Sequence, residues 1–265
     1  MKLMFLVVGI LLVGCVSNQN TREFSVDGND YSYDEKSKRM TVNGDWGFTI
    51  EDSAKVYDPS GGVEITKIHH DGKPGCELGW DQLIIKGRIN EDTYRLVKAH
   101  LESMVNCGYD YSYKVFLDSE GGSLYQGFKL GALFREKYVR AFIGDKAQCA
   151  SSCAIAFLAA TYRYIYEGGE IVFHAPYVRQ SFYDSNSGIN CALQKAKSDL
   201  NRYLNQILPE DTANYVYKRT MSVCSANDGW VINADAARLL GLSNVSKANK
   251  VTPGLVKGGA LKLNW

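Results

Sequence analysis

The segment Q-C-A-S-S-C places two serines, Ser151 and Ser152, between the cysteines Cys149 and Cys153. An apolar run, A-I-A-F-L-A-A, follows directly and is typical of a buried helix. A serine at the start of a helix is well placed to act as a nucleophile, because the helix N-terminus supplies free N–H groups and positive potential for a developing negative charge. The same position is also the commonest place for a serine that only caps the helix. The segment therefore predicts either a nucleophile or a cap.

Two further features favour the nucleophile. His174 stands at the end of an apolar strand in E-I-V-F-H-A-P, where an imidazole could accept the serine proton as a general base. Gly121 and Gly122 follow another apolar strand in F-L-D-S-E-G-G-S, and paired glycines let backbone N–H groups approach a ligand closely. A histidine on an apolar strand is more often an ordinary core residue, so the prediction depends on all these features meeting at one place.

Strands and helices alternate from residue 82 onward. Strands are predicted at 82–87, 113–119, 138–144 and 170–177, where apolar residues run together. Helices are predicted from Asn90 to Gly108, after the paired glycines through Tyr138, over 152–161, near 190–207 and 210–223, and between Asn233 and Gly241. This alternating order implies a mostly parallel sheet covered by helices, with the candidate residues at the ends of strands.

The N-terminus, M-K-L-M-F-L-V-V-G-I-L-L-V-G-C, is typical of an export signal. Its L-V-G-C resembles the lipobox of bacterial lipoproteins, which implies that Cys15 is lipidated and begins the mature protein. Residue 16 is not Asp, which favours the outer over the inner membrane, with the protein facing the periplasm. The predicted layout is a signal peptide at 1–14, a tether at 15–29, a small β extension at 30–75, an α/β domain at 76–250 and a tail at 251–265.

Charge and cysteine usage narrow the functional classes. Removing residues 1–14 takes away only Lys2, so that acidic and basic side chains balance and the mature net charge is zero. This balance argues against a nucleic-acid partner. An even number of cysteines after Cys15 predicts up to three disulfides in an exported chain. Their order suggests Cys76–Cys107, Cys149–Cys153 and Cys191–Cys224.

The pair Cys149–Cys153 would brace the turn that carries the serines. Two other uses of these cysteines remain open. One is thiol chemistry, and the other is a zinc site completed by His69 or His70, although no C-x-x-C pair supports a zinc site.

Four segments in order resemble successive blocks of the ClpP-like serine peptidase family, in the crotonase-like superfamily. They are F-L-D-S-E-G-G-S-L-Y-Q-G-F-K-L-G-A-L-F, A-Q-C-A-S-S-C-A-I-A-F-L-A-A, I-V-F-H-A-P and W-V-I-N-A-D-A-A-R-L-L-G-L, and the match spans roughly residues 82–245. The resemblance is nearest to the exported branch of the family. It implies an α/β fold of the ClpP/crotonase type, a repeated ββα spiral with a mostly parallel sheet, here with a small N-terminal β extension.

The resemblance also implies roles for residues. Ser151 matches the nucleophile, His174 the general base, and the N–H of Ser152 with one of Gly121 and Gly122 the oxyanion hole. Glu120 replaces a proline that is frequent in the family.

The third member of the triad departs from the family pattern. The family's aspartate corresponds to Cys224 or Ser225, and the nearest carboxylate is that of Asp228. Asp228 is therefore the predicted third member.

The leading interpretation is an envelope-anchored serine peptidase that cleaves peptide or protein substrates through a Ser151 acyl-enzyme, with no metal or other cofactor. The missing family aspartate leaves open a catalytically inactive binding or scaffolding lipoprotein. The superfamily also contains acyl-CoA enzymes, which an export signal disfavours. The segment Y-V-R-Q-S-F-Y-D-S-N-S-G-I-N after His174 does not resemble the element that joins subunits in ClpP relatives, so a homo-oligomer is possible but cannot be derived from the resemblance.

Overall fold

The computed structural model describes residues 21–26, 29–34, 37, 39–42, 46–56, 62–72, 77–105, 113–179 and 188–245. The chain divides into two compact units, Met1–Gly47 and Phe48–Trp265. In the smaller unit, β1 (Thr21–Val26) pairs antiparallel with β2 (Asn29–Asp34), which pairs antiparallel with β3 (Arg39–Val42). This unit supplies the small N-terminal β extension, although β1 lies within the segment predicted to be a tether.

The larger unit opens with antiparallel strands. β4 (Trp46–Val56) pairs with β5 (Val63–His70), and β5 pairs with β6 (Trp80–Ile89) over its full length. β5 and β6 both lie in the larger unit, whereas the sequence places β5 in the β extension predicted at 30–75.

The rest of the sheet is mostly parallel, as predicted. The first half of β7 (Lys114–Gly122) lies between β6 and β8 (Arg140–Ile143), and β8 also pairs with β10 (Tyr162–Ile165), all in parallel. Further along, Ser119 of β7 pairs in parallel with β9 (Gln148–Ala150). β9 pairs in parallel with β11 (Glu170–Phe173), and β14 (Trp230–Asn233) closes this side antiparallel to β11. Two ββα units, β5-β6-α1 (Glu91–Ser103) and β8-β9-α3 (Ser152–Ala159), are separated by β7-α2 (Leu124–Glu136), and the fold is mixed α/β.

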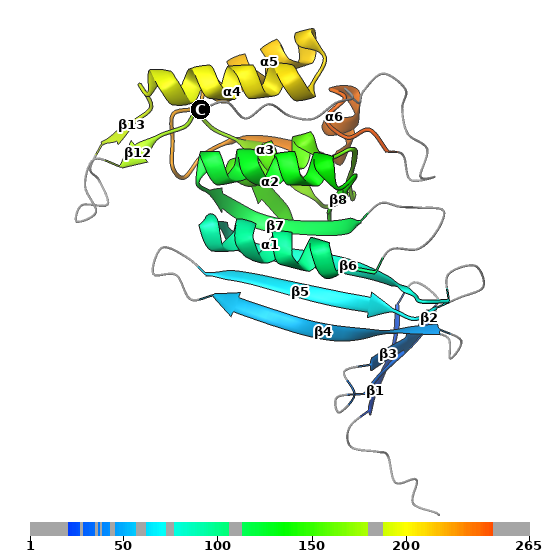
Figure 1. The fold of residues 1–265 in the computed structure, drawn as a ribbon. Coiled ribbons are helices and arrows are strands. Elements are labelled where there is room, and N and C mark those ends of the chain that lie inside the picture. Colours follow the sequence, from blue (N-terminus) through cyan, green and yellow to red (C-terminus); the bar gives the residue numbers. More distant parts are fainter. Residues whose placement is uncertain are drawn as a thin grey trace, which may run out of the picture. The chain divides into compact units, whose positions relative to one another are not determined.

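Figure 1 shows the arrangement of the helices, and side chains cap the N-termini of three of those described. Asn90 and Thr93 form a capping box at α1 (Glu91–Ser103), and Ser123 caps α2 (Leu124–Glu136). Asn233 caps α6 (Ala234–Leu239). The helices α4 (Gln194–Ile207) and α5 (Glu210–Met221) lie side by side, in yellow and orange-yellow. Within the described segments, no helix combines the length and the apolar character that crossing a bilayer requires.

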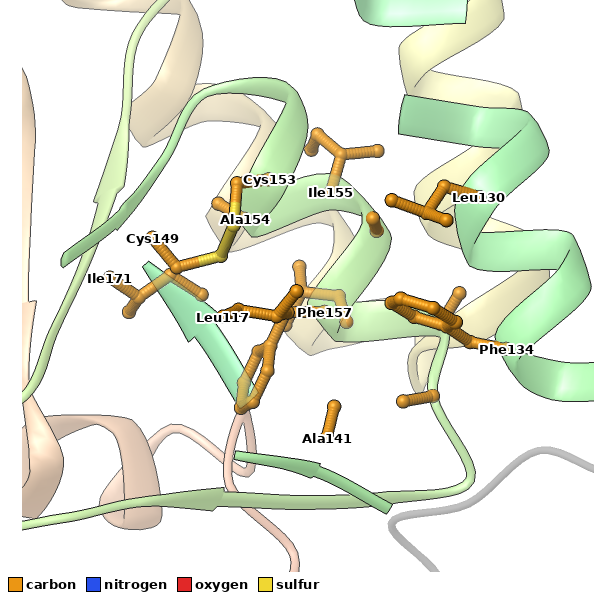
Figure 2. Close-up of a cluster of buried hydrophobic side chains, with 14 of the residues drawn as sticks. Leu117, Leu130, Phe134, Ala141, Cys149, Cys153, Ala154, Ile155, Phe157 and Ile171 are labelled. Atoms are coloured by element: carbon orange, nitrogen blue, oxygen red, sulfur yellow. A yellow bond between two sulfur atoms is a disulfide. The ribbon is translucent and has the colours of Figure 1, made fainter. Parts of the chain in front are cut away.

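The core surrounds α3 (Ser152–Ala159), every residue of which is buried. Such an all-round apolar helix is expected only inside a protein. Figure 2 shows Cys149 and Cys153 joined among core side chains that include Leu117, Ile171 and Phe157. The candidate serines therefore lie at the N-terminus of a helix that is buried throughout.

Two of the three suggested disulfides are present, Cys149–Cys153 and Cys191–Cys224. Because Cys149 and Cys153 are bonded to each other, the structure gives no support to a zinc site or to a free catalytic thiol at these positions. Cys76 and Cys107 lie outside the described residues, and so does Cys15.

Two small strands extend from the segment after His174. β12 (Val178–Arg179) and β13 (Ile189–Asn190) pair antiparallel, and they lead to Cys191 and its bond with Cys224. This second disulfide joins the chain that follows His174 to the chain that precedes Asp228.

Candidate active site

Three parallel strands bring the candidate residues to one edge of the sheet. β9 and β11 are in register, with Ala150 opposite Val172, so Ser151 and His174 follow the ends of neighbouring strands. β7 joins them on the other side of β9, with Ser119 opposite Cys149 just before the two glycines. Ligands bind outside the carboxyl ends of strands in open α/β sheets. The topology thus assembles the predicted residues at the kind of edge where α/β proteins place their sites.

Ser151 occupies a backbone conformation that residues with a side chain rarely adopt. Its φ is +55° and its ψ is −121°. Its N–H donates to the carbonyl oxygen of Val172 at 2.8 Å, which ties the turn to β11. Non-glycine residues in such conformations cost on the order of 1–3 kcal/mol and are concentrated at functional sites. The hydroxyl of Ser151 makes no capping hydrogen bond, so the structure does not support the cap interpretation for this residue.

Ser152 has a different environment. It is the first residue of α3 and is fully buried, and its Oγ makes no hydrogen bond within the described residues. It packs against α2 so tightly that a Cβ added at Gly127 would lie 2.8 Å from the Ser152 Cβ. A substrate carbonyl cannot approach a hydroxyl in this position, whereas the half-buried Ser151 remains reachable. The geometry therefore favours Ser151 over Ser152 as the nucleophile.

Gly121 lies against the serine turn. Its φ is +92°, and a Cβ placed there would lie 2.7 Å from the Ser151 Cβ and 3.1 Å from the Ser152 nitrogen. Its own N–H donates to Ser119 Oγ at 3.0 Å. Gly122 instead lies against β6, because a Cβ at Gly122 would lie 2.3 Å from the carbonyl oxygen of Ile89. Gly121 is thus the glycine in immediate contact with the serine turn.

Replacing Gly121 with alanine should destabilise the protein by about 1–3 kcal/mol, because the new side chain would occupy a positive-φ position. It would also place a Cβ 2.5 Å from the carbonyl oxygen of Ala150. Urea unfolding followed by circular dichroism measures the change. Gly144→Ala is the matched control, since a Cβ at Gly144 would meet only the Ala147 Cβ, at 3.9 Å. Equal stability of the two variants would contradict the described packing.

His174 is half-buried and lies beside Tyr177, with ring centroids 5.3 Å apart. Its Nδ1 is 3.0 Å from the carbonyl oxygen of Ala175. A carbonyl oxygen only accepts, so Nδ1 carries the proton in this contact. A neutral ring then leaves Nε2 as the acceptor, which is the tautomer that a general base of this type requires. Within the described residues no hydrogen bond joins His174 to Ser151.

Asp228, the predicted third member, makes its hydrogen bonds elsewhere. It is exposed and lies shortly before β14, whose Trp230 pairs with Phe173, so it belongs to the same edge as His174. The Asp228 Oδ2 accepts a hydrogen bond from Ser225 Oγ at 3.2 Å, and the Asp228 backbone N–H donates to Ser225 Oγ at 2.9 Å. The described residues show no hydrogen bond between Asp228 and His174. The group that contacts the histidine Nδ1 is a backbone carbonyl, which residue types in a sequence do not reveal.

The arrangement combines a serine in a sharp strand-to-helix turn, a histidine on the adjacent strand and backbone donors at a helix N-terminus. The first N–H groups of a helix have no intrahelical acceptor, and that of Ser152 lies beside Gly121. Such donors can stabilise an oxyanion that forms next to the Ser151 hydroxyl. Chemically, the edge is suited to acyl transfer.

Comparison with known proteins identifies a relative among the Clp proteases. No family model matches the chain. The ATP-dependent Clp protease proteolytic subunit 2 of Borreliella burgdorferi is 25% identical over 181 residues, which cover 66% of this chain and 86% of that protein. This similarity supports a ClpP-like fold and extends over most of the relative.

Two solved structures resemble the chain more distantly. One is a mutant of the 1510-N membrane-bound stomatin-specific protease, with 15% identity and a TM-score of 0.47 over 61% of this chain and 76% of that one. The other is ClpP1 from Listeria monocytogenes, with 18% identity and a TM-score of 0.44 over 61% of this chain and 87% of that one. Because both TM-scores are below 0.5, neither structure strengthens the assignment.

Proposed function

We propose that this chain is a ClpP-like serine peptidase in which Ser151 attacks the substrate carbonyl and His174 is the general base. The observation that carries the proposal is the turn at Ser151, whose positive φ places a half-buried serine between Gly121 and the strand that leads to His174. A serine kept in a costly conformation, with its hydroxyl uncommitted to capping, is expected where the hydroxyl takes part in a reaction.

The reaction follows from these positions. Ser151 Oγ forms a bond to the carbonyl carbon of a peptide, and its proton passes to Nε2 of His174. The N–H of Ser152 donates to the oxyanion, with Gly121 or Gly122 as the second donor. The Gly121 N–H must first leave Ser119 Oγ, to which it donates in this structure. The proton then moves from His174 to the leaving amine, and water hydrolyses the acyl-enzyme by the same steps in reverse. His174 must rotate or shift to reach Ser151, because its ring is not hydrogen-bonded to the serine in this structure.

A fluorophosphonate probe tests the proposal without any substitution. Such a probe reacts with an activated serine, and digestion followed by mass spectrometry locates the adduct. The adduct is expected on Ser151 in folded protein and is expected to disappear after heat unfolding. Labelling of another serine, or equal labelling before and after unfolding, would contradict the proposal.

The cellular setting is a second part of the proposal. The L-V-G-C sequence supports a lipid anchor at Cys15, and two disulfide-bonded cysteine pairs are consistent with an oxidising compartment. We therefore infer an enzyme at the periplasmic face of a bacterial envelope, acting on peptides or proteins.

One observation favours a second candidate function, that of a catalytically inactive binding or scaffolding lipoprotein. Asp228 contacts Ser225 instead of His174, and a serine triad without its carboxylate loses much of its rate. A binding module would remain folded and would not react with the fluorophosphonate probe, so the same experiment separates the two functions.

A further inference from the structure

The turn that carries Ser151 is enclosed by a covalent ring. Cys149 lies on one side of the turn in β9, and Cys153 lies on the first turn of α3. Their bond places the two Cα atoms 5.2 Å apart across a sequence separation of 4. An extended segment of that length would separate them by about 13 Å. The disulfide therefore excludes an extended path through residues 150–152, where the positive φ of Ser151 turns the chain from β9 into α3.

The noncovalent support of this reversal comes from backbone hydrogen bonds and from packing against Gly121. The hydroxyl of Ser151 does not cap α3. Two backbone hydrogen bonds secure the turn, from the Ser151 N–H to the carbonyl of Val172 and from the Ile155 N–H to the carbonyl of Ser151. A conformation that costs on the order of 1–3 kcal/mol persists only where its surroundings enforce it.

We propose that the Cys149–Cys153 disulfide is a positioning element that holds Ser151 in its positive-φ turn, with its hydroxyl directed for attack. This inference rests on the proposed function. Both cysteines are 0% exposed, so the bond lies beneath the turn, out of contact with solvent and substrate. The cysteines act through Ser151 and take no part in the reaction themselves.

The second disulfide provides a matched comparison. Cys191–Cys224 has a sequence separation of 33, against 4 for Cys149–Cys153. A longer closed loop restricts the unfolded chain more, so the Cys191–Cys224 bond contributes more stability through this effect. If Cys149 and Cys153 served stability alone, removing their bond should leave the exchange of the Ser151 amide and the labelling of folded protein unchanged.

The experiment compares three double variants of the full chain. Cys149→Ala/Cys153→Ala removes the bond, Cys149→Ala/Cys153→Val restores part of the lost volume without the bond, and Cys191→Ala/Cys224→Ala removes the other disulfide. Hydrogen exchange of the Ser151 and Ile155 amides reports the turn directly. The rate of fluorophosphonate labelling measures the reactivity of the Ser151 hydroxyl, and thermal unfolding measures the stability of the protein.

Both variants at 149 and 153 should exchange these two amides at least about tenfold faster and label at least about tenfold more slowly than the parent protein. The variant at 191 and 224 should lose thermal stability and leave exchange at Ser151 unchanged. Unchanged exchange in the 149/153 variants would overturn the inference, and so would parental labelling in Cys149→Ala/Cys153→Val, where packing is partly restored without the bond. If the parent protein does not label, the proposed function fails, and the exchange measurement still decides whether the disulfide holds the turn.

Discussion

Ser151→Ala should lower peptide hydrolysis by roughly 10⁴- to 10⁶-fold, because it removes the atom that forms the acyl-enzyme. Ser152→Ala should keep turnover within about tenfold of the parent protein, since it deletes a buried hydroxyl without a described partner and preserves the backbone N–H. Hydrolysis of a quenched fluorescent peptide library, followed by kcat and KM on one cleaved sequence, measures both effects.

The two variants serve as controls for each other. Both change a serine to alanine at neighbouring positions, so their difference isolates the role of the hydroxyl. Thermal unfolding of each confirms that the fold persists, and removing the Ser152 hydroxyl should be neutral or slightly stabilising because a buried polar atom without a partner is unfavourable. A large loss of turnover in Ser152→Ala with full activity in Ser151→Ala would show that the nucleophile has been assigned to the wrong serine.

Much of the larger fold could be predicted from the sequence because its elements carry strong local signals. Apolar runs indicated the longer strands, and Asn90 and Asn233 indicated the starts of helices with caps that the structure contains. The alternation of strand and helix then required parallel pairing. β9 and β10 were not predicted, because they directly flank the apolar run of α3 and β9 has only three residues.

The candidate site was predictable to the level of which residues share an edge. His174 follows a predicted strand and Gly121 lies at the end of another, whereas Ser151 follows β9, which joins that edge in the structure. The pattern of residues does not contain the positive φ at Ser151, because no glycine indicates it. The surroundings of Asp228 depend on a loop in which the Ser225 hydroxyl donates to the carboxylate, and such local competition cannot be deduced from residue spacing.

Arg163 is the least predictable feature of consequence for stability. It lies in the middle of the short strand β10 and is 0% exposed. Its guanidinium donates to the carbonyl oxygens of Leu158 at 3.2 Å and Ala160 at 3.0 Å, at the C-terminal end of α3. It also donates to those of Leu242 at 2.8 Å and Gly241 at 3.4 Å. Burial lowers the pKa of Arg163 to about 9, so the group is still charged at neutral pH.

Arg163→Met should therefore destabilise the protein by about 3–5 kcal/mol, because buried carbonyls lose their donors at about 1–3 kcal/mol each. The loss is smaller than the sum, since the variant no longer buries a charge. Arg95→Met is the control: Arg95 is exposed and pairs with Asp92 at 2.8 Å, so its loss should cost less than about 1 kcal/mol. Urea unfolding measures both variants.

Arg163 and Ser151 lie at opposite ends of α3. Loss of the Arg163 contacts should therefore lower the stability of the protein without changing the reactivity of Ser151. The guanidinium meets the helix where the helix ends, whereas Ser151 stands where the helix begins. The folded fraction of Arg163→Met should thus react with the fluorophosphonate probe at close to the parental rate, once the rate is corrected for the unfolded population. A labelling rate that falls far more than the folded fraction would mean that the turn at Ser151 depends on the far end of its helix, and that the support of the nucleophile is not local.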